Sequence, residues 1–116
     1  MVYNLIEITV IEGLAMDVQQ LRCNAEAAAQ LLKALGNPER LLLLCQLSEG
    51  ERSVSELESL LGIQQPTLSQ QLGVLRREDL VATRREGKQI FYRIDSPAAL
   101  AVIKTLYQWF CAKEPK

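Results

Sequence analysis

Residues 53–77 read SVSELESLLGIQQPTLSQQLGVLRR, and this stretch decides the fold of the chain. Ser53 followed three residues later by Glu56 matches a capping box, so a short helix is predicted over residues 53–61. Residues 62–64 form a turn that contains glycine, and apolar side chains recur along one side of a second helix over residues 65–77. Two helices joined by such a turn are typical of a helix-turn-helix motif.

The sequence before this motif predicts two more helices. The first begins near Asp17, because Asp17 and Gln20 resemble a capping box, and its apolar stripe ends at Leu35. Gly36-Asn37-Pro38 ends that helix and starts the next one. Residues 38–48 are apolar nearly all round, so we expect the second helix to be central and buried.

After the motif, the spacing of apolar residues changes from helical to alternating. Residues 81–85 and 89–94 favour strands, and Glu86-Gly87-Lys88 between them predicts a hairpin with a basic tip. Asp95-Ser96-Pro97 is a strong signal for a helix start. The last helix is predicted to run to about residue 112, with four apolar residues aligned on one side: Leu100, Ile103, Tyr107 and Phe110.

These elements predict a mainly α (α+β) fold, a winged helix-turn-helix with about five helices and a two-stranded β-hairpin wing. The 116 residues suffice for one domain, and a chain this short often gains stability by forming an oligomer. We expect an N-terminal arm over residues 1–16, the DNA-binding and dimerisation domain over residues 17–112, and a tail over residues 113–116.

The net charge of −1 conceals an asymmetry along the chain. Residues 1–63 carry 4 basic and 9 acidic side chains, whereas residues 64–94 carry 6 basic and 3 acidic ones. The balance excludes a histone-like polycation, and a basic segment in an acidic protein is a candidate phosphate-facing patch. The chain has no apolar run of about 18 residues and no basic export signal, so we expect a cytoplasmic protein that does not span a membrane.

The second helix of the motif carries the residues that we expect to read DNA. Such a helix fits the major groove, where glutamine pairs with adenine and hydroxyl groups bond to bases or phosphate. We interpret its polar residues as a reading surface rather than as an ordinary solvated face: Gln64, Gln65, Thr67, Ser69, Gln70 and Gln71. The wing adds backbone contacts through Arg84, Arg85, Lys88 and Gln89. Two further arginines, Arg76 and Arg77, either touch phosphate or pair with Glu78 and Asp79.

Three segments together resemble the ArsR/SmtB family of winged-helix repressors. They are LLKALGNPERLLLLCQL, SVSELESLLGIQQPTLSQQLGVLRREDLV and TRREGKQIFYRI, and the similarity covers roughly residues 28–94 in matching order and spacing. The resemblance implies a homodimer built from the first and last helices, which binds a palindromic double-stranded operator and blocks transcription. It also implies that an inducer releases the protein from DNA.

Two departures from the family pattern bear on the inducer. Ser53-Val54-Ser55 stands where metal-sensing members carry Cys-Val-Cys, and serine hydroxyls do not replace soft thiolates. The other common metal site uses histidine, and the chain has no histidine. We therefore predict no metal site, no cofactor and no catalytic residues. Gln64 also stands where serine is usual, so we expect a weaker cap on that helix.

The three cysteines remain as candidates for a sensor. Cys45 and Cys111 resemble the pair of those family members that sense thiol oxidation or reactive sulfur. That resemblance implies that an oxidant or a persulfide links the two residues, switches operator binding off and induces genes for sulfide or oxidant detoxification. Linking thiols that sit apart would pull the last helix against the second, because a disulfide requires Cα atoms about 4.4–6.8 Å apart.

Other interpretations stay open from the sequence alone. Cys45 lies amid leucines and has the alternative role of a small buried apolar residue, whereas Cys23 is expected to be a bystander. A metal(loid)-responsive repressor would instead use the thiolates of Cys23, Cys45 and Cys111. A third possibility is a winged-helix module that binds protein rather than DNA. We expect Tyr107, Trp109 and Phe110 to pack at the dimer interface.

Overall fold

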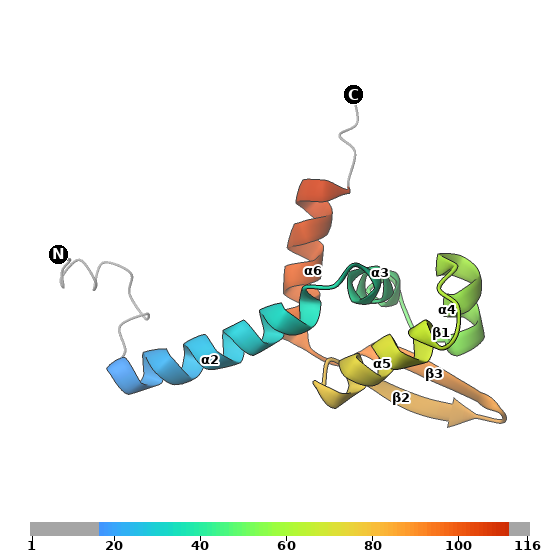
Figure 1. Ribbon diagram of the computed structural model, residues 1–116, viewed down its shortest axis with the longest axis horizontal. Helices are drawn as coiled ribbons and strands as arrows, with labels where there is room; N and C mark the ends of the chain where they lie inside the picture. The colour runs from blue at the N-terminus through green and yellow to red at the C-terminus, as the bar shows by residue number, and fades with distance from the viewer. Residues whose placement is uncertain (1–16, 112–116) are drawn as a thin grey trace. The chain divides into compact units, whose positions relative to one another are not determined.

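The computed structural model describes residues 17–111. Contacts along the chain divide it into two compact units, residues 1–30 and residues 31–116. The described residues contain five helices, as the sequence predicted, and three strands (Figure 1). The expected arm over residues 1–16 and tail over residues 113–116 lie outside the described residues.

The first two helices begin at the predicted caps. Helix α2 (Val18–Leu35) follows Asp17, whose Oδ1 accepts a hydrogen bond of 2.8 Å from the backbone N–H of Gln20. Helix α3 (Pro38–Leu47) follows Asn37, whose Oδ1 accepts from the backbone N–H of Arg40 at 3.0 Å. These bonds satisfy amide groups that have no partner inside the helix.

The helix-turn-helix consists of α4 (Val54–Leu61) and α5 (Thr67–Arg77). Ser53 Oγ accepts from the N–H of Glu56 at 3.1 Å, and Glu56 Oε1 accepts from the N–H of Ser53 at 2.8 Å, so the predicted capping box is confirmed. Gly62 ends α4 with φ of 70°, a left-handed conformation that glycine adopts without a steric cost. Helix α5 starts at Thr67, two residues later than predicted.

The wing is a hairpin of β2 (Val81–Glu86) and β3 (Gln89–Ile94), and its tip is shorter than predicted because Glu86 pairs with Gln89. The prediction of a two-stranded wing missed one strand. A third strand, β1 (Arg52–Ser53), pairs with β3 and gives an antiparallel sheet of order β1-β3-β2. Two residues are too few to show a strand in the sequence, and Ser53 also caps α4, so the same residue ends β1 and starts the helix.

The last helix, α6 (Pro97–Phe110), starts where predicted, since Ser96 Oγ accepts from the N–H of Ala99 at 3.1 Å. The four-residue stripe predicted along it meets the core only in its first half. Ile103 is buried, but Tyr107 and Phe110 are exposed. Helix α6 therefore packs on the core through its first half and leaves an aromatic end exposed.

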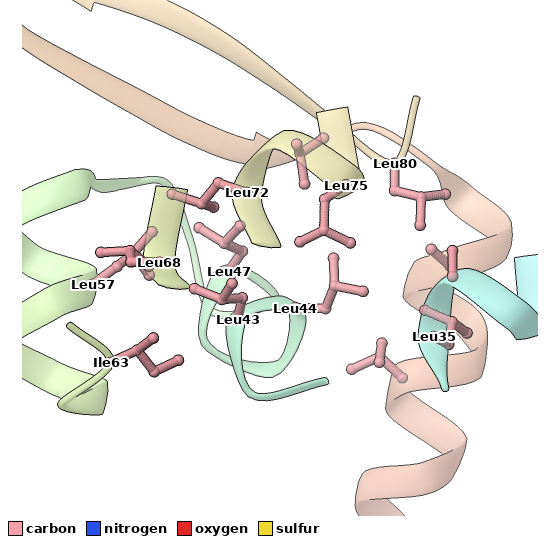
Figure 2. Packing of buried hydrophobic residues seen from close by; sticks show 14 residues of the cluster. Leu35, Leu43, Leu44, Leu47, Leu57, Ile63, Leu68, Leu72, Leu75 and Leu80 are labelled. Atoms are coloured by element: carbon pink, nitrogen blue, oxygen red, sulfur yellow. The ribbon is translucent and has the colours of Figure 1, made fainter. Parts of the chain in front are cut away.

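The core lies between α3, α5, the base of the wing and the first half of α6 (Figure 2). Leu68, Leu72 and Leu75 of α5 face the leucines of α3, and all three are fully buried. Helix α3 is central, as expected, with Leu43 and Leu44 fully buried, but the expectation of burial does not hold at Leu42, which is 47% exposed. Packing by leucines fixes α5 against α3 and so sets which of its side chains face outward. Within residues 17–111, no helix is long and apolar enough to cross a bilayer.

Candidate nucleic-acid interface and thiol pair

The turn before α5 carries the first two of the glutamines singled out from the sequence. Gln64 and Gln65 are exposed, but they precede the helix instead of lying on it. Gln65 Oε1 accepts a hydrogen bond of 3.0 Å from the backbone N–H of Ser69. Helix α5 is therefore capped by a glutamine side chain from the turn, a role that the sequence did not reveal because glutamine is not a usual capping residue.

The remaining polar residues of this set lie on α5 and differ in exposure. Ser69 and Gln70 are exposed, whereas Thr67 and Gln71 are half-buried. Gln71 Oε1 accepts from Arg40 Nη1 of α3 at 2.8 Å, so this glutamine is engaged within the protein. The exposed polar surface consists of Gln64, Gln65, Ser69 and Gln70.

On the wing, Arg84 is held by carboxylates. Its guanidinium donates to both carboxylate oxygens of Glu51, at 2.9 and 2.8 Å, and to Glu86 Oε1 at 2.8 Å. It also lies over the ring of Phe91, 4.5 Å from the centroid. The hydrogen bonds from Arg84 lower the pKa of Glu51, and those to Glu51 and Glu86 raise the pKa of Arg84. Carboxylates therefore engage three of the five N–H donors of Arg84, and its predicted contact with DNA stays a prediction.

The other wing residues are available to a ligand. Arg85, Lys88 and Gln89 are exposed around the hairpin tip, and Gly87 takes the left-handed turn conformation with φ of 64°. Successive side chains of a strand point to opposite faces, so Arg84 packs over Phe91 while Arg85 points to the opposite face. Figure 1 shows this hairpin next to α5, and α5 contacts β2. Arg76 and Arg77 are exposed in the last turn of α5.

The three cysteines are free thiols in different surroundings. Cys45 is half-buried on α3, Cys111 is exposed directly after α6, and Cys23 is exposed on α2. Cys45 opens into a cavity of about 450 Å³ between α3 and α6, lined also by Gln46, Glu49, Lys104, Tyr107 and others. Cys111 follows Tyr107 by one helical turn, and its N–H donates to the Tyr107 carbonyl at 2.9 Å.

Three causes raise the pKa of the Cys45 thiol. Burial is the largest, and the negative charges of Cys111 and Glu49 add to it. Cys45 lies on α3, which α6 contacts, and Cys111 follows the last residue of α6. Because the thiolate is the reactive form, Cys45 is slowed at neutral pH.

This raised pKa predicts the pH dependence of the reaction of Cys45 with iodoacetamide. The rate should rise with pH and reach half its maximum at a pH above the ordinary value for a thiol, since the thiolate forms later than usual. Glu49→Gln removes a negative charge and should make Cys45 react faster at neutral pH. Mass spectrometry of the Cys45 peptide at each time point measures both effects.

Glu58→Gln serves as the matched control for this measurement. Glu58 is an exposed carboxylate on α4 and is not among the groups that shift the pKa of Cys45. The same profile in wild type and Glu49→Gln would contradict the assigned cause.

The serines in place of the family's metal-binding cysteines have a structural role. Ser53 is buried and forms the capping box, and its Oγ lies 3.3 Å from Ser55 Oγ. Over residues 17–111, no group of three or more histidine, cysteine, aspartate or glutamate side chains is arranged to hold a metal ion.

Sequence reasoning missed two residues that bear on this surface, Arg40 and Glu51. Glu51 gave no signal because its partner Arg84 is 33 residues away. The sequence did carry a signal for Arg40. A cation in the first turn of a helix opposes the helix dipole, so a partner with negative charge is expected nearby.

Comparison with known proteins agrees with this arrangement. The model for bacterial regulatory proteins of the arsR family matches residues 37–83. The biofilm growth-associated repressor of Agrobacterium fabrum is 58% identical over 78% of this chain and 77% of its own length. The repressor of that name from Xylella fastidiosa is 52% identical over 85% of this chain and 87% of its own length.

Solved structures support the same grouping. The crystal structure of the transcriptional repressor BigR from Xylella fastidiosa has a TM-score of 0.76 at 52% identity, over 84% of this chain and 100% of that one. Reduced HlyU from Vibrio cholerae has a TM-score of 0.78 at 42% identity, over 82% of this chain and 100% of that one. These relatives are named as transcriptional regulators, not as enzymes.

Proposed function

Because the chain belongs to the ArsR family of winged-helix bacterial regulatory proteins, we propose that it is a homodimeric repressor that binds palindromic operator DNA. Its reading surface is the exposed polar set Gln64, Gln65, Ser69 and Gln70, with Arg85 and Lys88 of the wing on the DNA backbone. The observation that carries this proposal is an exposed, glutamine-rich helix start beside a basic hairpin tip. Repression, rather than activation, is favoured by the two relatives named as repressors.

A dimer through α6, with the exposed face of α2 as its second element, is supported by apolar surface. Tyr107, Trp109 and Phe110 at the end of α6 are 52%, 79% and 81% exposed. On α2, Val18, Leu21 and Leu32 are also exposed. Contiguous apolar side chains on a surface commonly mark an interface, and two copies would place two recognition helices on successive major grooves.

The proposed inducer is an oxidant or a reactive sulfur species that acts on Cys45 and Cys111. A hydropersulfide RSSH first transfers its outer sulfur to Cys45, which yields a Cys45 persulfide and RSH. The Cys111 thiolate then attacks the inner sulfur of that persulfide, a Cys45–Cys111 disulfide forms and hydrogen sulfide leaves. Two thiols lose two electrons, and the sulfane sulfur takes them up, so no other oxidant is needed.

The position of the thiols supports this switch. Cys45 lies on α3, which packs against the recognition helix α5, and Cys111 ends α6, the helix with the exposed aromatic residues. A bond between them would draw these two helices together and change the spacing of the recognition helices in a dimer. The genes that the protein would control under this proposal serve the detoxification of sulfide or of oxidants.

DNA binding is tested by the salt dependence of duplex affinity. We expect log Kd to rise linearly with log salt concentration, and each of Arg85→Ala and Lys88→Ala to reduce the slope by about 2, because each removes one phosphate contact from each subunit of the dimer. Fluorescence anisotropy with a labelled duplex of about 30 base pairs, selected from a random library, gives the slopes; this length holds two half-sites one helical turn apart.

Arg84→Ala is the matched control for these two variants. It removes the same charge as Arg85→Ala, but its guanidinium is already bonded to Glu51 and Glu86, so the slope should change less. Affinity that does not vary with salt, and that is unchanged in Arg85→Ala/Lys88→Ala, would favour the protein-binding module instead.

A further inference from the structure

Arg40 joins three helices through one side chain. In the first turn of α3, its Nη1 donates to Gln71 Oε1 of α5 at 2.8 Å. Its Nε donates to the carbonyl of Ala34 at 2.5 Å, and Nη2 donates to the carbonyl of Lys33 at 3.2 Å. The two carbonyls belong to the last turn of α2, so the guanidinium links the end of α2 to the recognition helix.

The position of this guanidinium is fixed from several sides. The last carbonyls of a helix lack partners within the helix and carry partial negative charge, which offsets the unfavourable position of a cation at the start of α3. The backbone N–H of Arg40 is bonded to Asn37, and the residue is half-buried. Arg40 therefore presents Nη1 to α5 from a preorganised position.

The chemistry of the two groups dictates how the amide of Gln71 is turned. A guanidinium is a donor only, so the atom of Gln71 that faces Arg40 must be the oxygen. The amide nitrogen then points away from Arg40. Gln71 is half-buried, so part of its side chain reaches solvent.

We propose that Arg40 is a positioning residue for DNA binding, which holds Gln71 so that its amide nitrogen donates to an acceptor on the duplex. This inference rests on the proposed function. A free glutamine such as the exposed Gln70 can read adenine with its oxygen and nitrogen together, whereas the oxygen of Gln71 is turned toward Arg40 and its nitrogen is the group left for the duplex. Its partner is an acceptor atom, either a phosphate oxygen or a base edge such as guanine O6 or N7.

The test is a double-mutant cycle with Arg40→Lys and Gln71→Met. Lysine keeps the positive charge but replaces the planar fork by a single ammonium group. Methionine has nearly the length of glutamine and removes both its donor and its acceptor. Kd is measured on the duplex that the wild-type protein selects from a random library, and thermal melting reports the fold of each variant.

We expect each single variant to bind the selected duplex about tenfold more weakly, the scale of one lost hydrogen bond. The double variant should lose no more than a single one, because both changes remove the same contact to DNA. A merely structural Arg40 would lower the melting temperature without this non-additivity. A duplex of the same base composition in shuffled order distinguishes a phosphate acceptor from a base edge. If the variants lose the same affinity on both duplexes, the acceptor is a phosphate oxygen. If they lose more affinity on the selected duplex, the acceptor is a base edge.

Gln71→Met keeps the bonds from Arg40 to α2, so its folding is expected to be preserved. Wild-type affinity in Gln71→Met, or losses that multiply in the double variant, would overturn the inference while leaving the proposed function intact. Failure of the wild-type protein to select any duplex would instead overturn the proposed function, and the role of Arg40 with it.

Discussion

An organic hydropersulfide is expected to release the wild-type protein from its selected duplex, and Cys45→Ser is expected to abolish that release. Cys45 is the half-buried thiol beside the cavity between α3 and α6, and it accepts the transferred sulfur in the proposed reaction. Serine has nearly the same size but forms neither a persulfide nor a disulfide. Coupling between two sites commonly amounts to about 5- to 150-fold in affinity, and we expect the wild-type loss to fall in that range.

Anisotropy titrations of the duplex before and after persulfide treatment measure this release. Mass spectrometry of the treated protein identifies the link between Cys45 and Cys111. Cys111→Ser should also lose the response, while Cys23→Ser, which removes the exposed thiol of α2, should keep it. Persulfide-dependent release in Cys45→Ser would sink the proposed switch. Release by arsenite that depends on Cys23 would favour the metal(loid) alternative.

The parts of the fold that the sequence predicted correctly are set by neighbouring residues. The caps at Asp17, Asn37, Ser53 and Ser96 all accept the expected backbone N–H three residues later. These signals act over one helical turn, so a single sequence contains them in full. The order of the helices and the hairpin followed from them.

The parts that could not be predicted depend on residues distant in the sequence. Arg84 and Arg85 are neighbours with the same charge, and the bidentate pairing of Arg84 with Glu51, 33 positions earlier, is one difference that the sequence does not show. Gln71 and Gln70 differ in the same way, since Arg40 lies 31 positions before Gln71. Sequence composition therefore identified a basic wing and a glutamine-rich helix correctly, but not which members of each set are already engaged.

The apolar stripe of α6 shows a limit of sequence patterns. An apolar stripe shows which side of a helix avoids water, but not what covers that side. In α6 the first half of the stripe, with Ile103, meets the core, whereas Tyr107 and Phe110 remain exposed. In the proposed dimer, another copy of the chain covers the second half of the stripe, so that both halves are shielded from water.

Leu72→Ala should produce a large loss of stability. Leu72 is fully buried and faces α3 from the middle of α5 (Figure 2). Truncation of a buried leucine removes apolar burial and leaves a cavity, which together cost about 2–5 kcal/mol. Leu60→Ala is the matched control, because Leu60 on α4 is 56% exposed and the same truncation there should cost less than about 1 kcal/mol.

Thermal melting of both variants at one fixed protein concentration measures these costs, and the concentration matters because dimerisation contributes to the apparent stability. DNA affinity is then measured well below the melting temperature of Leu72→Ala. Leu72 has no contact with solvent, so any weakening of DNA binding in the folded variant must come from displacement of α5 and its exposed residues. Equal melting temperatures for Leu72→Ala and Leu60→Ala would mean that α5 is not held against α3 by these leucines, and the preorganised position of Gln71 would lose its physical basis.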